Sequence, residues 1–113
     1  MMSTGPVAAT RAAALFRGLA EPTRVRILLE LQAGERRVSD LVESLALPQS
    51  TVSTHLGCLR DCGLVESRAE GRQSFYRLAV PELHDLLKAA EAVLARTGEA
   101  VALCPRFGVG TGQ

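Results

Sequence analysis

The chain has 113 residues, enough for one domain with a single hydrophobic core and too few for two. Hydrophobic residues make up 47% of the chain and aromatic residues only 4%, which favours a small helical domain that completes its core by dimerising. The formal net charge of +1 excludes a strong basic field, but twelve of the thirteen basic residues are Arg, whose planar guanidinium suits phosphates and guanine edges.

The first part of the chain predicts two helices. We expect residues 1–7 to be disordered, and apolar residues at helical spacing then predict a helix over residues 8–19. Pro22 suits the first position of a second helix, because proline has no amide hydrogen to leave unpaired there. This second helix is predicted to stop at Gly34.

Two further helices are predicted close behind. Ser39 is expected to cap a short third helix whose inner face is apolar. Pro48 then opens a fourth helix over residues 49–62, and Gly63 terminates it. Two short helices joined by a tight turn are typical of a helix-turn-helix.

After the fourth helix the periodicity changes from helical to alternating. Residues 64–69 and 73–79 are predicted to form the two strands of a hairpin around a glycine turn. A lone hairpin is only marginally stable, so we expect it to lie against the helices. A final helix from Pro81 to about Gly98 carries a broad apolar stripe. Together with the apolar first helix, this stripe predicts a homodimer.

These elements predict a fold that is mainly α with one β-hairpin, a homodimeric winged helix-turn-helix. We expect one DNA-binding and dimerisation domain over residues 8–97 and a glycine-rich C-terminal tail over 98–113. In such a fold the second helix of the helix-turn-helix enters the major groove of DNA, and the hairpin forms a wing beside it.

Small polar side chains at the start of the fourth helix are the candidate readers of DNA. Gln can bond adenine bidentately, and Ser and Thr are short enough to let a helix sit deep in the major groove. Capping and solvent exposure explain such residues equally well in an isolated helix, but the hairpin that follows favours DNA. The predicted readers are Gln49, Ser50, Thr51, Ser53, Thr54 and His55. The hairpin arginines placed for phosphate or minor-groove contact are Arg68, Arg72 and Arg77.

Two cysteines, Cys58 and Cys62, lie four residues apart inside this predicted recognition helix. At about 100° per residue they fall beside the core stripe of the helix, on the same flank as Thr51 and His55. A lone cysteine is most often a small buried hydrophobe, but a pair outside the core stripe suggests a chemical switch on DNA binding. The core stripe itself comprises Val52, Leu56 and Leu59.

The cellular compartment bears on what these thiols can do. The sequence has no charged start followed by an apolar stretch, and no apolar run near the roughly 18 residues of a membrane helix. We therefore expect a cytoplasmic protein without membrane attachment, whose three cysteines stay reduced. Reduced thiols are available as metal ligands or redox sensors rather than as structural disulfides.

Three segments carry a resemblance to a known family. These segments resemble the ArsR/SmtB family of metal-sensing bacterial repressors: LAEPTRVRIL at 19–28, QSTVSTHL at 49–56, and the wing, with GLV at 63–65 and GR at 71–72. The resemblance covers about residues 10–95. The resemblance implies a homodimer that binds operator double-stranded DNA and loses affinity for it when an inducer metal binds.

The resemblance also implies a metal site. Residues 38–40 replace the cysteine pair of the arsenic type, and the paired ligands of the zinc type are missing from the last helix. Cys58, Cys62 and the tail cysteine Cys104 resemble instead the ligands of the CmtR cadmium and lead sensors, whose third cysteine comes from the C-terminal region of the other subunit. Three thiolates suit cadmium or lead better than zinc, which normally takes a fourth ligand in a structural site.

Several alternatives stay open. His55 is either a metal ligand or a base reader, and a tail cysteine such as Cys104 is more often a bystander than a ligand. The same thiols would serve a redox-responsive or persulfide-responsive repressor of the same fold. An enzyme is not expected, because the chain has two histidines, no Cys-x-x-Cys motif and no defensible pairing of nucleophile and base.

Overall fold

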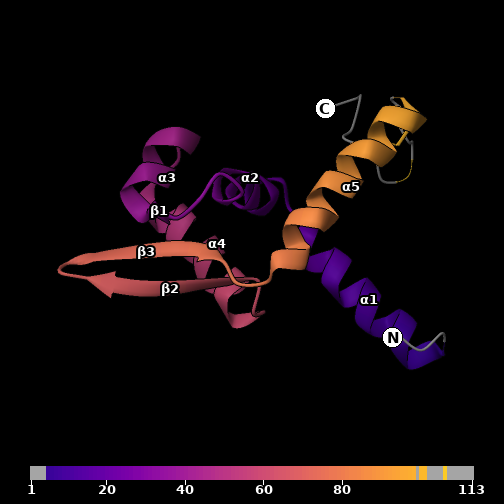
Figure 1. The fold of residues 1–113 in the computed structure, drawn as a ribbon, viewed down its shortest axis with the longest axis horizontal. Coiled ribbons are helices and arrows are strands. Elements are labelled where there is room, and N and C mark those ends of the chain that lie inside the picture. Colours follow the sequence, from indigo (N-terminus) through magenta and orange to yellow (C-terminus); the bar gives the residue numbers. More distant parts are fainter. Residues whose placement is uncertain (1–4, 99, 102–105, 107–113) are drawn as a thin grey trace. The chain divides into compact units, whose positions relative to one another are not determined.

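The computed structural model describes residues 5–98, 100–101 and 106. Helices come first, then a hairpin, then a last helix, which confirms the predicted mainly α fold class (Figure 1). The elements are α1 (Pro6–Leu19), α2 (Pro22–Leu31), β1 (Arg36–Arg37), α3 (Val38–Leu45), α4 (Gln49–Asp61), β2 (Val65–Glu70), β3 (Gln73–Leu78) and α5 (Pro81–Thr97). The chain divides into two compact units, Met1–Val80 and Pro81–Gln113.

Proline begins α1, α2 and α5, since its fixed φ suits the first turn of a helix. The first helix starts at Pro6, earlier than the predicted residue 8, so Pro6 and Val7 are helical rather than part of a disordered start. The second helix ends at Leu31, earlier than the predicted stop. A turn then leads to Gly34, which has a φ of 136°. Glycine adopts this angle readily, whereas other residues are strained there.

The end of α4 is fixed by a Schellman motif. The amide of Leu64 donates to the carbonyl of Leu59 at 2.9 Å, and the amide of Gly63 donates to the carbonyl of Arg60 at 2.9 Å. Gly63 adopts a φ of 78°, as a left-handed residue after a helix must. The helix therefore ends at Asp61, one residue before the predicted end, and the glycine terminates it as predicted.

The cap of α3 lies two residues before the predicted one. The helix begins at Val38 with Arg37 at the cap position, so Ser39 lies inside the first turn and is not the cap. The carboxylate of Asp40 takes the capping role, because it accepts a hydrogen bond from the Arg37 amide at 3.0 Å. Hydrogen bonds from the Arg37 side chain and amide lower the pKa of Asp40 to about 2.

The strand β1 is the element that the sequence did not predict. Its residues Arg36 and Arg37 pair antiparallel with Tyr76 and Phe75 of β3, which gives a three-stranded sheet in the order β1-β3-β2. Two residues are too few to show an alternating pattern, so only the pairing with a distant strand defines β1. The predicted hairpin of β2 and β3 is confirmed.

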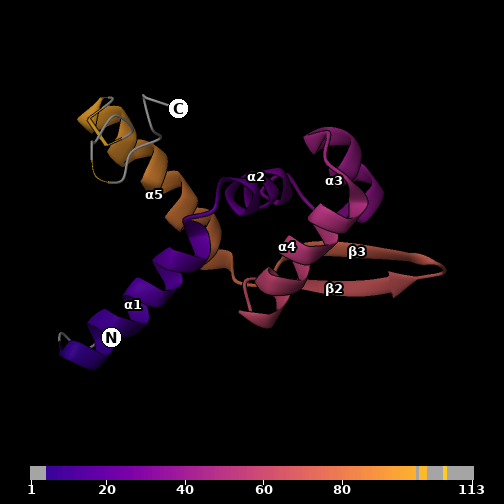
Figure 2. The same ribbon diagram turned by 180° about the vertical axis from the view of Figure 1, so that it is seen from behind.

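Helix α4, the predicted recognition helix, packs against α2, α3 and β2. Its predicted core stripe is confirmed, since Val52, Leu56 and Leu59 are at most 1% exposed. Burying each such side chain contributes roughly 1.5–3 kcal/mol, so the stripe fixes which face of α4 points outwards. Figures 1 and 2 show α2, α3 and α4 at the base of the hairpin, whose tip reaches beyond them. The same unit also buries Ile27, Leu28, Leu31, Leu41, Leu45, Val65 and Tyr76.

Helix α5 is the main element in the described part of the second unit. Leu83 and Leu87 are its buried residues, one helical turn apart, whereas Val93 and Leu94 are 53% and 44% exposed. Gly98, with a φ of 63°, follows the helix near the predicted end. Among the described residues, no helix combines the length and the apolar character needed to cross a membrane.

Candidate DNA interface and thiol pair

The turn between α3 and α4 sets the direction of the recognition helix. Ala46 adopts a left-handed conformation with a φ of 56°, which costs a residue other than glycine roughly 1–2 kcal/mol. Its amide still donates to the Val42 carbonyl at 3.0 Å, so the last turn of α3 is closed. Pro48 then occupies the cap position of α4 in extended conformation, and the helix begins at Gln49.

The predicted readers divide into an outer and an inner group. Gln49, Ser50, Ser53 and Thr54 are exposed, whereas Thr51 is half-buried. The hydroxyl of Thr54 donates to the Ser50 carbonyl at 2.8 Å, which leaves its lone pairs free to accept a bond from a base. The outer group therefore forms an unobstructed polar surface at the start of α4.

His55 belongs to the inner group and connects two helices. Its Nε2 lies 3.4 Å from Oε2 of Glu21, the residue that caps α2 by accepting a bond from the Arg24 amide at 3.1 Å. Burial raises the pKa of Glu21, but bonds from the Thr23 and Arg24 amides and the proximity of His55 outweigh it, so this pKa lies below its usual value. Sequence reasoning had no signal for this contact, because the two residues are far apart in the chain.

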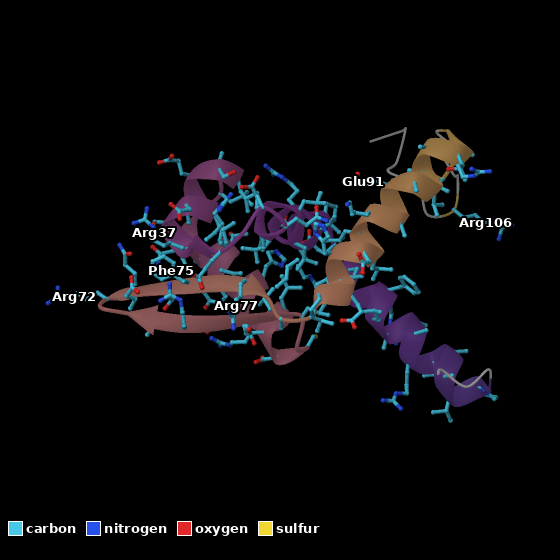
Figure 3. All side chains as sticks on the ribbon, in the orientation of Figure 1. Arg37, Arg72, Phe75, Arg77, Glu91 and Arg106 are labelled. Carbon is cyan, nitrogen blue, oxygen red and sulfur yellow. The ribbon has the colours of Figure 1, made fainter. Side chains whose placement is uncertain are left out.

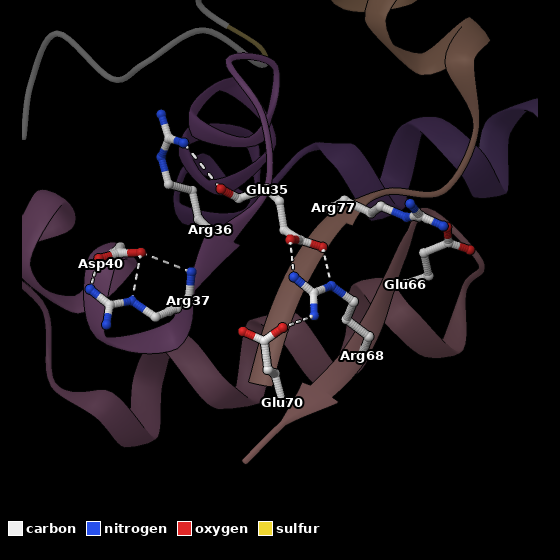
Figure 4. Close-up of polar contacts among 8 residues, drawn as sticks. All are labelled: Glu35, Arg36, Arg37, Asp40, Glu66, Arg68, Glu70 and Arg77. Carbon is white, nitrogen blue, oxygen red and sulfur yellow. Dashed lines mark hydrogen bonds and ion pairs between the residues drawn. The ribbon is translucent and has the colours of Figure 1, made fainter. Parts of the chain in front are cut away.

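The three wing arginines have different surroundings. Arg68 forms ion pairs with Glu35 and Glu70, and Arg77 forms one with Glu66 (Figure 4). Arg72 lies at the tip of the hairpin and points away from it (Figure 3). Of the three, Arg72 alone has no ion pair within the described part of the chain.

A hollow of about 300 Å³, lined mainly by polar residues, joins the helix-turn-helix to the wing. It brings Gln49 of α4 and Arg72 of the wing tip, two predicted DNA contacts, onto one concave surface. Ser39, at the start of α3, also lines the hollow, although the sequence suggested only a capping role for it. The other lining residues are Arg37, Val38, Gln73 and Ser74.

Both predicted thiols of α4 lie on the surface. Cys58 and Cys62 are exposed, as expected from their angle to the core stripe. The Cys62 amide donates to the Cys58 carbonyl at 3.1 Å, so the helical turn between them is intact and both project from the same flank. Within the described residues, no cluster of three Cys, His, Asp or Glu is close enough to hold a metal. The predicted third ligand, Cys104, lies outside the described residues.

Cys62 also borders a second, largely apolar pocket. This pocket has a volume of about 320 Å³ and lies between α1 and the end of α4. Its other lining residues are Ala14, Leu15, Gly18 and Leu64. The C-terminal end of the thiol flank therefore faces the first helix.

Comparison with known proteins identifies the family. A sequence profile described as "Bacterial regulatory protein, arsR family" matches residues 21–67, from the cap of α2 into β2. The chain is 38% identical over 95 residues to a probable mercury resistance operon repressor of Streptomyces lividans, covering 84% of this chain and 76% of that protein. It is 52% identical over 67 residues to the transcriptional regulator CmtR of Mycobacterium bovis, covering 59% and 57% of the two chains.

A solved structure agrees with these relatives. A homodimeric winged helix-turn-helix DNA-binding domain from Mycobacterium bovis, described as a possible ArsR-family regulator, superposes with a TM-score of 0.74 and 29% identity. The match covers 88% of this chain and 94% of that one. The predicted winged helix-turn-helix is thereby confirmed, and so is the expectation of a regulator rather than an enzyme. The chain belongs to the arsR family of bacterial regulatory proteins and is a DNA-binding transcriptional repressor.

Proposed function

We propose that this repressor is a homodimer that leaves its operator when a soft metal ion binds Cys58, Cys62 and Cys104, with cadmium or lead as the inducer. The observation that carries the proposal is the exposed thiol pair on one flank of the recognition helix. One relative is described as a probable mercury resistance operon repressor, which supports a metal response.

The thiol pair fits a soft metal by its donor chemistry. Side chains at i and i+4 on a helix lie about 5–6 Å apart at Cβ, within reach of one large thiophilic ion. Both thiols of the pair are exposed, so an ion reaches them without opening the core. Two thiolates leave an ion with too few ligands, and Cys104 is the remaining cysteine of the chain. Three sulfur ligands favour cadmium or lead over zinc.

Operator recognition is assigned to the outer surface of α4 and the wing tip. Gln49, Ser50, Ser53 and Thr54 are proposed to read base edges, because they are exposed at the start of the recognition helix. Arg72 is proposed to hold a phosphate, since it shares a hollow with Gln49 and forms no ion pair within the described residues. Thr51 and His55, which are half-buried, are proposed to contribute to base recognition from the inner side of α4.

Dimerisation is assigned to apolar surfaces that each unit leaves open. Helix α1 buries none of its residues, and its Leu15 and Phe16 are 37% and 57% exposed. In α5, Val93 and Leu94 are exposed as well. Large apolar side chains gathered at such positions are typical of a subunit interface. The solved relative from Mycobacterium bovis is described as homodimeric, which supports the same assembly here.

The proposed switch works along the thiol flank of α4. Thr51 and His55 lie on this flank toward the DNA-reading start, and Cys58 and Cys62 lie toward its end. An ion that ties the end of the helix to the tail restricts how the start is presented to DNA. A preference of about 1–3 kcal/mol for the released conformation lowers DNA affinity roughly 5–150-fold.

A thiol-redox repressor is the second candidate. Both α4 thiols are exposed, and exposure is what an oxidant or a persulfide donor requires. Such a repressor would release DNA through a disulfide or persulfide, without metal. The two functions therefore differ in the inducer and not in the residues.

Titration with inducers separates the two. A duplex that binds the protein is first selected from a random-sequence library and labelled with fluorescein. The reduced protein is then bound to this duplex, and its release is followed by fluorescence anisotropy. Cadmium and lead are expected to release the duplex at about one ion per site, mercury similarly, and zinc only at higher concentration. Release by hydrogen peroxide or a persulfide donor, with none by the metals, would establish the redox function instead.

A further inference from the structure

The wing has one charged face and one face toward the core. In the hairpin register Glu66 lies opposite Arg77, and Arg68 lies opposite Phe75, so these four side chains share a face. On the other face Tyr76 is buried. The short strand β1 pairs with the edge of β3 opposite β2, and Glu35 directly precedes β1.

Arg68 is the centre of the interactions on the charged face (Figure 4). It donates to Glu35 in a bidentate pair, from Nη2 to Oε1 at 2.7 Å and from Nε to Oε2 at 3.0 Å. Its Nη1 donates to Oε1 of Glu70 at 3.0 Å. The guanidinium carbon lies 4.6 Å from the centre of the Phe75 ring, within cation–π range. All three guanidinium nitrogens thus have carboxylate partners.

The electrostatics agree with this geometry. The hydrogen bond from Arg68 holds the pKa of Glu35 below its usual value, and the bond to Glu35 raises the pKa of Arg68 further. Both side chains are partly exposed, at 48% for Arg68 and 28% for Glu35. An exposed ion pair adds little to the stability of a fold.

The base of the wing packs against the helices, but its outer part has few buried side chains to set its direction. Beyond Val65, every residue of β2 is exposed, and so are Gln73 and Ser74 at the start of β3. The pairing with β1 extends over two residues only. The bond between Glu35 and Arg68 crosses 33 positions of sequence and ties the outer part of the wing to the turn after α2.

We propose that Arg68 is a positioning residue, which holds the wing through Glu35 and Phe75 so that Arg72 reaches the DNA backbone. Arg68 itself does not contact phosphate. This assignment revises the sequence-based prediction of Arg68 as a DNA contact. It rests on the proposed phosphate contact of Arg72 and is independent of the proposed metal response. The proposal implies that Glu35 favours DNA binding, although its charge has the same sign as that of the DNA backbone.

The substitution Glu35→Gln separates positioning from contact by the sign of its effect. If Arg68 positions the wing, removing the Glu35 charge loosens the wing and weakens DNA binding, roughly fivefold, the lower end of ordinary coupling between sites. If Arg68 contacts phosphate, the same substitution removes a competing carboxylate and strengthens binding. Glu70→Gln is the matched control, because it removes an equal charge nearer the tip while leaving the bidentate pair in place.

Two further variants make the test independent of any single substitution. Arg68→Lys keeps the charge but not the planar fork, so it should weaken binding as Glu35→Gln does, whereas a phosphate contact would survive it. The exchange of charges in Glu35→Arg with Arg68→Glu should restore affinity relative to each single variant. Arg72→Ala is the reference for a lost phosphate contact and should lower the salt slope by about one unit.

Affinity is measured by anisotropy against the enriched duplex and a mixed-sequence duplex of equal length, over a series of salt concentrations. The thermal unfolding midpoint of each variant should match that of the parent protein. Weaker binding by Glu35→Gln and Arg68→Lys, with recovery in the charge exchange, supports positioning. Tighter binding by Glu35→Gln, or unchanged binding by Arg68→Lys, would overturn the proposal.

Discussion

Replacing Cys58 or Cys62 with serine is expected to abolish high-affinity cadmium binding. Each thiol supplies one of the two ligands that α4 presents on a single flank, and a serine hydroxyl is a poor ligand for a soft ion. The loss is measured as disappearance of the ultraviolet sulfur-to-metal absorption band during a cadmium titration. Because both side chains are exposed, neither substitution should lower the thermal unfolding midpoint.

Asp61→Asn provides the control for this prediction. Asp61 is an exposed carboxylate in the same turn as the thiols, so its loss removes a negative charge without removing sulfur. The control should bind cadmium nearly as well as the parent protein, since ligation rather than general attraction holds the ion. Retention of the full band by either cysteine variant would show that the pair on α4 is not the metal site.

Replacing Phe16 and Leu94 with glutamate is expected to split the homodimer into monomers. Both side chains are large and apolar, and they are 57% and 44% exposed in the single chain. A carboxylate at either position would be buried in the proposed dimer interface without a partner for its charge. Monomers lose the bivalent grip on two half-sites, so operator affinity should fall by about 10² or more. Sedimentation velocity at micromolar concentration reports the assembly, and circular dichroism checks that the helices remain.

Leu29→Glu is the matched control for the dimer. Leu29 is another large apolar side chain with 39% exposure, but it lies on α2, outside the proposed interface. This variant should remain dimeric. If the double variant at positions 16 and 94 also sediments as a dimer, the interface does not lie on α1 and α5.

The local periodicity of the sequence predicted much of the fold. Val52, Leu56 and Leu59 repeat at helical spacing, and this alone defined the buried face of α4 and the exposed flank of Cys58 and Cys62. The proline starts and the glycine end of the helices follow from backbone chemistry at single residues, which is local as well. The cap of α3 was missed by two residues, because the carboxylate of Asp40 within the helix, rather than the predicted serine, accepts the capping bond from the Arg37 amide.

Contacts between residues far apart in the sequence could not be predicted from local periodicity. The strand β1 exists only through its pairing with β3, and the ion pair of Glu35 with Arg68 joins two segments with no common pattern. Arg68 was predicted to contact DNA from its charge and its place on the wing, and charge alone does not reveal a nearby carboxylate. The role of Cys104 stays a prediction, since the residue lies outside the described part of the chain.

Cadmium-induced release of DNA by the Cys104→Ser variant tests the proposed switch most directly. Two thiolates on one helix can hold an ion without constraining anything outside that helix, whereas a third ligand from the tail couples α4 to the rest of the dimer. The variant should keep part of the sulfur-to-metal band and yet stay on the enriched duplex at saturating cadmium. Release as complete as that of the parent protein, at the same cadmium concentration, would contradict a role for the tail cysteine in the switch.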